Sequence, residues 1–201
     1  MFLKKLFSYI STALRMAWDA VIKLKVLLLD GVFCGIQFGK RCKFFGLPYF
    51  SQSMNGKIVV GDNCTFRSRE TSNMIGLNHR CMVSTSDAAG NHPKIKIGDN
   101  CGFSGASILC FKSITVGDNV RVGANCLIID GDAHFDDVRT SAPEAIVIED
   151  NVFIGADCII RKGVTIGKNS VVGMRSMVLH DIPANCVAVG NPAKVIKEIK
   201  P

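Results

Sequence analysis

Residues 116–183 carry the pattern that decides the fold, and they read VGDNVR, VGANCL, IIDGDA, then a polar interruption, then IEDNVF, IGADCI, IRKGVT, IGKNSV, VGMRSM and VLHDIP. An aliphatic side chain recurs at every sixth position on both sides of the interruption, which spans 130–145. The aliphatic positions are Val116, Val122 and Ile128, then Ile148, Ile154, Ile160, Ile166, Val172 and Val178. A period of six fits neither an α-helix nor a strand whose side chains alternate between two faces.

Hexapeptide repeats of this kind are typical of a parallel β-helix. Each hexapeptide forms one short strand and a corner, and three close one triangular coil, with successive coils about 4.8 Å apart. The corners need residues that tolerate a positive φ, and Gly-Asp-Asn recurs at 61–63, 98–100 and 117–119. The sequence therefore predicts an all-β domain over residues 31–185, with loops inserted near 86–93 and 130–146 and a tail at 186–201.

The composition describes one soluble globular domain with appendages. The chain has 201 residues, of which 48% are hydrophobic and 20% are charged, so it is long enough to bury a core. Its net charge of +7 suggests an acidic ligand or surface, although solvated lysines alone would also produce it. The repeat region has no basic run interleaved with aromatic residues, which argues against a nucleic-acid partner.

The nine cysteines follow the repeat rather than the spacing of a disulfide framework. Five of them lie four residues after a repeat position, in the slot that Val120, Val152 and Val164 fill elsewhere. These five are Cys42, Cys64, Cys101, Cys126 and Cys158. We therefore predict small, inward-facing free thiols in a reducing compartment, and no zinc site, because no CxxC pair is present.

Residues 1–30 predict an amphipathic helix, because apolar residues recur at steps of three and four while basic residues lie largely off that stripe. The stripe comprises Leu3, Leu6, Phe7, Ile10, Leu14, Trp18, Val21, Leu24 and Leu28, and the basic residues are Lys4, Lys5, Arg15 and Lys23. Charges interrupt the segment too often for a membrane span, and residues 17–20 make a poor signal-peptide cleavage site. Two roles stay open: the helix lies on an anionic membrane surface, or it packs on the first coil and covers a sheet edge.

Between residues 31 and 95 the repeat is imperfect. Residues 86–93 break the count and are expected to project as a loop, with His92 exposed. Residues 75–79 fit the repeat, so we expect His79 to occupy an inward slot and to be buried.

The interruption at 130–145 holds the candidate chemistry. It begins Asp130-Gly-Asp132-Ala-His134 and continues to Arg139. An imidazole with a pKa of about 6.5 can accept a proton from a hydroxyl and return it to a leaving group. A carboxylate on its far nitrogen would fix the tautomer, and Asp130 and Asp132 are both close enough in sequence to do so. A regular solenoid needs no such excursion, and loops of this kind carry function disproportionately.

The segment Asp130-x-Asp132-x-His134, the hexapeptides on either side, and the ending from Asp181-Ile182-Pro183 to Gly190-Asn191-Pro192-Ala193-Lys194 resemble the left-handed β-helix acetyltransferases. The sequence is similar to galactoside and maltose acetyltransferases, and more similar to the branch that O-acetylates capsular and other cell-surface polysaccharides. The likeness is close over 97–197 and only a loose repeat over 31–96. It implies a left-handed β-helix that forms a homotrimer with active sites between subunits.

The resemblance also implies a reaction, which is transfer of an acetyl group from acetyl-CoA to a sugar hydroxyl without a metal. His134 matches the general base, Asp130 and Asp132 the acids beside it, and the Ala156 N–H the group that stabilises the oxyanion. The acceptor positions that it implies are Arg139 and Phe153, and the CoA positions are Ala156, Met174, Arg175, Leu179, His180, Lys194 and Lys197. Arg175 and His180 depart from the family pattern, so the charge along the CoA path is expected to differ.

Two other functions stay open. Zinc carbonic anhydrases share the solenoid but need three converging histidines, whereas His79, His92, His134 and His180 lie at least 13 residues apart. A non-catalytic scaffold or a membrane-docked interaction module is the other, because a fold alone does not fix function. We expect a cytoplasmic protein whose N-terminal helix is the part able to contact the inner face of the membrane. The sequence leaves open the acceptor sugar, O- against N-acetylation, and acetyl against a longer acyl chain.

Overall fold

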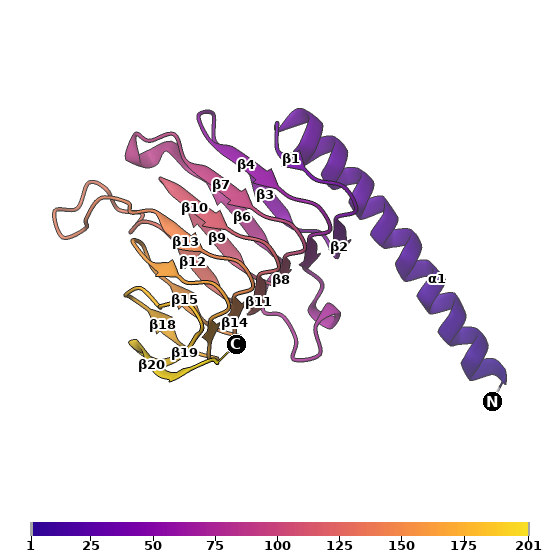
Figure 1. Ribbon diagram of the computed structural model, residues 1–201. Helices are drawn as coiled ribbons and strands as arrows, with labels where there is room; N and C mark the ends of the chain where they lie inside the picture. The colour runs from indigo at the N-terminus through magenta and orange to yellow at the C-terminus, as the bar shows by residue number, and fades with distance from the viewer. Residues whose placement is uncertain (1, 201) are drawn as a thin grey trace.

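Three parallel β-sheets form the walls of a triangular prism, which is the left-handed parallel β-helix that the repeat and the resemblance predict (Figure 1). This computed structural model describes residues 2–200, with side chains for all of these except residues 2–8 and 33. Sheet A comprises β1 (Gln37–Phe38), β4 (Lys57–Val60), β7 (Lys94–Ile97), β10 (Ser113–Val116), β13 (Ile146–Ile148) and β16 (Thr165–Ile166).

The other two walls have the same stacked order. Sheet B comprises β2 (Lys43–Phe45), β5 (Thr65–Arg67), β8 (Gly102–Ser104), β11 (Arg121–Ala124), β14 (Phe153–Ile154), β17 (Val171–Val172), β19 (Cys186–Gly190) and β20 (Ala193–Glu198). Sheet C comprises β3 (Tyr49–Ser51), β6 (Met82–Thr85), β9 (Ser107–Cys110), β12 (Leu127–Ile129), β15 (Ile159–Ile160) and β18 (Met177–Val178). The chain visits the walls in the order A, B, C, so each circuit adds one strand to each wall. The final strand, β20, pairs antiparallel with β19 and ends the stack.

The strand register confirms the hexapeptide period. Ile148 lies beside Ile166 in sheet A, and Ile160 lies beside Val178 in sheet C. Both pairs are 18 positions apart, which is three hexapeptides, so one circuit of the prism uses three repeats.

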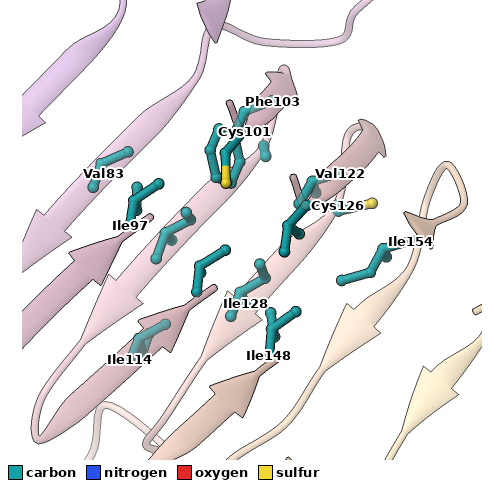
Figure 2. Packing of buried hydrophobic residues seen from close by; sticks show 14 of the residues in the cluster. Val83, Ile97, Cys101, Phe103, Ile114, Val122, Cys126, Ile128, Ile148 and Ile154 are labelled. Carbon is teal, nitrogen blue, oxygen red and sulfur yellow. The ribbon is translucent and has the colours of Figure 1, made fainter. Parts of the chain in front are cut away.

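The repeat positions fill the interior of the prism (Figure 2). Ile97, Ile114, Ile128, Ile148 and Ile154 are all buried, and Figure 2 shows such side chains pointing from the walls into a common interior. The prediction that the five cysteines of the repeat slot are inward-facing free thiols is confirmed, because all five are buried and free. A hydrogen bond with the neighbouring Cys101 thiol, and then burial, raise the pKa of Cys64 to about 12, which makes it an inert core residue.

The first coils have an aromatic interior instead. Phe38, Phe44 and Phe50 come from the three walls and meet edge to face, with ring centroids 5.0 to 6.4 Å apart. Phe66 and Phe103 stack beneath them, with centroids 5.3 Å apart. This end of the prism is therefore filled by a few large rings, whereas the later coils are filled by many aliphatic side chains.

The turns between sheets A and B form a column that we name the A–B corner. Each residue of its Gly-Asp-Asn turns has a separate structural role. The asparagines there have φ between 56° and 61°, the left-handed conformation that asparagine tolerates. The aspartates form a ladder in which Asp99 Oδ1 accepts from the Asp62 N–H at 2.7 Å, and Asp118 Oδ1 accepts from the Asp99 N–H at 2.7 Å. A Cβ on Gly98 would lie 2.3 Å from Asp118 Oδ1, so only glycine fits beneath that carboxylate.

Long excursions leave the prism at its other two columns of turns, the B–C corner and the C–A corner. Residues 68–81 leave the B–C corner and include the short helix η2 (Glu70–Ser72). Residues 86–93, with η3 (Asp87–Ala89), and residues 130–145 both leave the C–A corner (Figure 1).

The prediction for residues 75–79 is wrong. Ile75 is 65% exposed and lies in the excursion at 68–81 rather than in a strand. His79 is also exposed, and its Nδ1 lies 2.9 Å from the Arg80 carbonyl oxygen. The segment imitates the repeat locally, but no neighbouring strand pairs with it, so it never enters the stack.

The predicted amphipathic helix is α1 (Phe2–Lys25), which continues as the π-helical turn η1 (Val26–Phe33). Figure 1 shows α1 lying across the end of the prism next to β1 and β2 and extending well beyond it. Ile22 and Val26 are buried in the core, and Arg69 Nη1 pairs with Asp19 Oδ1 at 3.2 Å. The helix is thus fixed to the prism by its C-terminal part.

The apolar stripe itself is not the surface that packs on the prism. Leu14 is 66% exposed, Trp18 62% and Leu24 59%. At about 100° per residue, Ile22 lies on a different side of the helix from that stripe. Leu3, Leu6, Phe7, Lys4 and Lys5 lie outside the residues whose side chains are described. No helix among the described residues is long and apolar enough to cross a membrane.

Candidate active site

A cavity with a volume of about 720 Å³ lies on the outer face of sheet B. Three of the residues implied for acetyl transfer, Phe153, Ala156 and Met174, line it. Its floor is formed by the outward positions of β5, β8, β11 and β14, and Asn73 and Ile75 from the excursion at 68–81 form part of its wall.

The cavity exists because outward positions on successive coils carry no side chain. Gly102, Gly123 and Gly155 all line it. A Cβ on Gly123 would lie 2.6 Å from the Ala156 nitrogen, and one on Gly155 would lie 2.6 Å from the Met174 nitrogen. Glycine therefore leaves the Ala156 N–H uncovered, and within the described residues this N–H donates to no other group. A buried backbone donor without a partner is costly, so a ligand oxygen is its natural acceptor.

His134 lies at the C–A corner and does not line this cavity. It is exposed in the excursion at 130–145. The loop is held by its own turns, because the His134 carbonyl oxygen accepts from the Asp137 N–H at 3.2 Å and from Thr140 Oγ1 at 2.7 Å. Phe135 anchors the loop on Phe111, with ring centroids 4.8 Å apart. The loop is thus ordered while its imidazole faces outward.

Asp130, implied as one of the acids beside His134, is bound elsewhere. It is fully buried, and its carboxylate accepts from the N–H groups of Phe111, Lys112 and Ser113 at 2.6, 2.8 and 2.8 Å. The Cys110 thiol also donates to it at 3.3 Å. These bonds hold the turn of the preceding coil, so within one chain Asp130 supports the base of the loop rather than the ring of His134.

Asp132, the second implied acid, pairs with Lys162 and Arg161 of a later coil. Hydrogen bonds from Lys162 and then Arg161 hold the pKa of Asp132 below its usual range. Ser141 joins the same group, because Lys162 Nζ donates to Ser141 Oγ at 2.6 Å. Asp132 thus ties both ends of the excursion to the prism.

Arg139, implied for acceptor binding, pairs with Asp137 inside the loop. Arg139 Nε lies 2.9 Å from Asp137 Oδ1, and the Arg139 side chain is 86% exposed. The bond from Arg139 lowers the pKa of Asp137, and the charge of His134 adds to that effect. Asp137, which the sequence reasoning passed over, is therefore the acid that His134 influences.

The remaining implied residues divide between the corners. Arg175 is at the B–C corner, where its Nε lies 3.7 Å from Asp157 Oδ2, and Leu179 and His180 are exposed at the C–A corner. Lys194 and Lys197 are exposed on β20, beyond the last parallel strand of sheet B. The described residues include no group of three His, Cys, Asp or Glu side chains that could hold a metal ion.

Two arginines in the cavity were not anticipated. Arg67 and Arg121 line it, and both stand on outward positions of sheet B. An outward arginine in a strand looks like any solvated charge until the excursion at 68–81 is known to enclose it. No sequence signal marked that excursion, because residues 75–79 read as one more repeat.

The hexapeptide repeat of succinyl-transferase, as a family model, matches residues 94–129 and 145–176. The gap between the matched segments coincides with the excursion that carries His134. The chain is 43% identical to galactoside O-acetyltransferase from Escherichia coli strain K12 over 91 residues, which are 43% of this chain and 45% of that protein. The chain spans less than half the length of the curated relatives it matches.

Solved structures share the fold at low sequence identity. One is the N-acyltransferase AntD from Bacillus cereus in complex with dTDP and 3-hydroxybutyryl-CoA, with a TM-score of 0.65 and 18% identity over 85% of this chain and 87% of that chain. Another is a hexapeptide-repeat containing acetyltransferase from Vibrio cholerae complexed with acetyl coenzyme A, with a TM-score of 0.52 and 22% identity over 94% of this chain and 89% of that chain.

Proposed function

We propose that this chain is a hexapeptide-repeat acetyltransferase, and that it transfers an acetyl group from acetyl-CoA to a hydroxyl of a sugar, in a cell-surface polysaccharide or its precursor. The observation that carries the proposal is the cavity over sheet B, where glycines leave the Ala156 N–H uncovered beside Phe153 and Met174. A cavity of about 720 Å³ has room for a thioester arm and part of a sugar.

The residues present suit the proposed chemistry. His134 accepts the proton of the acceptor hydroxyl as the hydroxyl oxygen attacks the thioester carbonyl carbon. The Ala156 N–H donates to the carbonyl oxygen as it becomes negative. The carbon–sulfur bond then breaks, and His134 returns its proton to the departing CoA thiolate. A positioned base contributes about 10²–10⁴ in rate and one oxyanion donor about 10²–10³.

A single chain keeps these two groups apart, because His134 leaves the C–A corner and Ala156 lies at the B–C corner. We therefore propose that the loop of one subunit reaches the cavity of the next. Two different surfaces that meet in this way form a heterologous contact, which closes into a ring when the rotation permits. Three copies complete such a ring, and this accounts for the homotrimer implied by the resemblance.

The CoA arm is proposed to run from Ala156 past Met174 toward β20. Lys194 and Lys197 there would meet the phosphates of its adenosine end, with Arg175 as a further cation near Met174. Leu179 and His180, at the C–A corner, would come to this path from the neighbouring subunit.

The decisive experiment is His134→Ala, with His92→Ala as its matched control. Both histidines are exposed in excursions of the C–A corner, but only His134 follows the Asp130-x-Asp132 segment. We expect His134→Ala to lower kcat about 10²–10⁴-fold and His92→Ala to leave it unchanged, with acetyl-CoA and a panel of sugar acceptors. Mass spectrometry of surface glycans from cells with and without the protein identifies the acceptor by the mass of one acetyl group. Near-wild-type turnover by His134→Ala would reject the mechanism.

A further inference from the structure

The cavity over sheet B is cationic, because Arg67 and Arg121 line it and no acidic residue does. Arg121 stands directly beside Phe153 in the register of β11 and β14. Arg67 stands beside Ser104 in the register of β5 and β8. Both arginines therefore stand on the floor of the cavity, and the Arg67 side chain reaches the excursion at 68–81.

Neither arginine forms an ion pair within the described residues. Arg67 Nη1 donates to the Ser72 carbonyl oxygen at 2.7 Å, and its guanidinium lies 4.9 Å from the centroid of the Phe45 ring. Arg121 Nη1 donates to the Asn100 carbonyl oxygen. A guanidinium has five N–H donors, so these contacts fix both groups and leave donors for a ligand. Two positioned, unpaired arginines suit a carboxylate, which each can bind with two parallel hydrogen bonds.

The position of the two arginines along the prism indicates which end of the cavity would hold the acceptor and which would hold CoA. Measured from the coil of Phe153 and Ala156, Arg121 is one coil toward the N-terminus and Arg67 is three coils away, about 14 Å at 4.8 Å per coil. Met174, Lys194 and Lys197 lie in the opposite direction. A thioester that arrives from the C-terminal side leaves the arginine side of the cavity for the attacking sugar.

We propose that the acceptor is a sugar that carries a carboxylate, which binds Arg121 near the reacting hydroxyl, and that the glycan extends over the floor of the cavity to Arg67. This inference rests on the proposed acetyl transfer and narrows its substrate to acidic glycans.

The test compares methyl hexosides with the matching methyl hexuronosides, which differ only by a hydroxymethyl or a carboxylate group. We expect the wild type to acetylate the hexuronosides with the higher kcat/KM. Arg121→Gln should lower that preference about tenfold or more, while KM for acetyl-CoA stays unchanged. Arg67→Gln should act in the same way on an oligosaccharide acceptor. Arg80→Gln, which removes an exposed arginine outside the cavity, is the matched control and should have no effect.

Three outcomes would overturn the inference. Equal or better use of the neutral hexosides rejects it and leaves acetyl transfer standing. A raised KM for acetyl-CoA in Arg121→Gln reassigns the arginines to CoA phosphates. Acetylation of no acceptor, with His134→Ala indistinguishable from the wild type, rejects the proposed function together with the inference.

A second inference comes from a different part of the molecule, the exposed stripe of α1. Ile10, Leu14, Trp18, Val21, Leu24 and Leu28 are between 46% and 66% exposed, although they are large and apolar. The helix reaches the prism through Ile22, Val26 and the Asp19–Arg69 pair, so the stripe faces away from the part of the chain that could cover it. Figure 1 shows the helix lying across the end of the prism, an orientation that lets it rest on a flat surface.

The charges of α1 identify the kind of surface. Five basic residues stand in α1, Lys4, Lys5, Arg15, Lys23 and Lys25, against the single acid Asp19. Asp19 is already paired with Arg69. An amphipathic helix with excess positive charge and an aromatic residue in its apolar stripe inserts into the boundary of an anionic bilayer.

We infer that α1 docks the protein on an anionic membrane surface, with the stripe buried among the acyl chains and the prism held outside. Trp18 is the single tryptophan of the chain, so its fluorescence reports the insertion directly. We expect a blue shift and cosedimentation with vesicles of phosphatidylcholine and phosphatidylglycerol, weakened by salt, and little of either with phosphatidylcholine alone.

The matched variants place one aspartate on different sides of α1. Leu14→Asp and Leu24→Asp interrupt the stripe and should abolish vesicle binding, whereas Met16→Asp, at a residue 70% exposed away from the stripe, should retain it. Circular dichroism confirms that each variant is folded. Equal effects of all three variants, or no binding by the wild type, would overturn the inference. If the protein self-associates without lipid and Leu14→Asp abolishes that association, a second copy of the chain covers the stripe instead.

Discussion

The B–C and C–A corners are built by the same repeat on the same prism, yet they hold opposite contents. At the B–C corner, glycines remove side chains from successive coils and leave a cavity and an unpartnered Ala156 N–H. At the C–A corner, inserted residues add a loop with His134 and several acids, and other groups of the same chain bind the carboxylates of Asp130, Asp132 and Asp137. The candidate site at the B–C corner results from missing side chains, whereas the one at the C–A corner results from inserted residues. Neither corner holds both the candidate base His134 and the Ala156 N–H. The proposed active site therefore needs one corner from each of two chains.

The sharpest way to break this comparison is to mix two inactive variants. His134→Ala disables the C–A corner, and Gly102→Trp fills the cavity, where a Cβ meets only the Arg121 side chain at 3.5 Å. We expect each variant alone to lose at least about 10² in activity. Co-refolding equal amounts should restore about a quarter of the wild-type sites, since that share combines an intact loop with an intact cavity.

Native mass spectrometry of the mixture shows whether mixed oligomers have formed. Mixed oligomers without recovered activity would mean that loop and cavity do not cooperate between chains.

The second prediction concerns only the B–C corner. Gly123→Ala places a Cβ 2.6 Å from the Ala156 nitrogen and covers its N–H, so we expect kcat to fall about 10²–10³-fold. Gly102→Ala adds the same methyl group where only Arg121 is near, and it should change kcat less than about threefold. Steady-state kinetics with thermal melts as a folding control distinguish the two. Equal kcat values would remove Ala156 from the mechanism.

The third prediction concerns the support of the C–A corner. Asp130→Ala leaves the N–H groups of Phe111, Lys112 and Ser113 without the buried carboxylate that accepts from them, and we expect a loss of about 3 kcal/mol or more in the free energy of unfolding. Asp136→Ala, an exposed acid of the same loop, should change it by about 0.5 kcal/mol or less. Urea unfolding measures both. Similar stabilities would show that the turn does not depend on Asp130.

The smallest expected effect is a pH dependence at Asp132. Hydrogen bonds from Lys162 and Arg161 lower its pKa in the folded state, so its contribution to stability is present above the unfolded carboxyl pKa of about 4 and is lost as pH falls through the folded value. The wild type should therefore lose thermal stability on acidification below about pH 4 more steeply than Asp132→Asn. If the melting temperatures of the two proteins fall equally across that pH range, the stabilising role of the Asp132 ion pairs is contradicted.

The prism was predictable because its cause is local and repeated. An aliphatic residue every sixth position and a free cysteine slot each appear many times, so single irregularities did not obscure them. Residues 75–79 show the limit of this reasoning: the segment matches the repeat, but membership of a stack depends on strands above and below that one segment does not reveal.

For the candidate site, the sequence predicted only features that depend on a residue's own loop. His134 stood out because it follows an interruption in a regular pattern. The partners of Asp130 are N–H groups 17 to 19 positions earlier, and those of Asp132 lie 29 and 30 positions later, so their roles depend on stacking. Arg67 and Arg121 became notable only once the intervening coils had brought them into one cavity.

From β13 to β18 each circuit of the prism takes 18 residues, so these later coils are evenly spaced. Because every coil pairs with the next through the same backbone hydrogen bonds, a whole coil can be duplicated or removed without changing which side chains face inward. The distance between the thioester end of the cleft and the lysines of β20 can therefore change only in steps of about 4.8 Å. A protein of this kind with one more coil would therefore suit a CoA donor that is longer by one coil spacing.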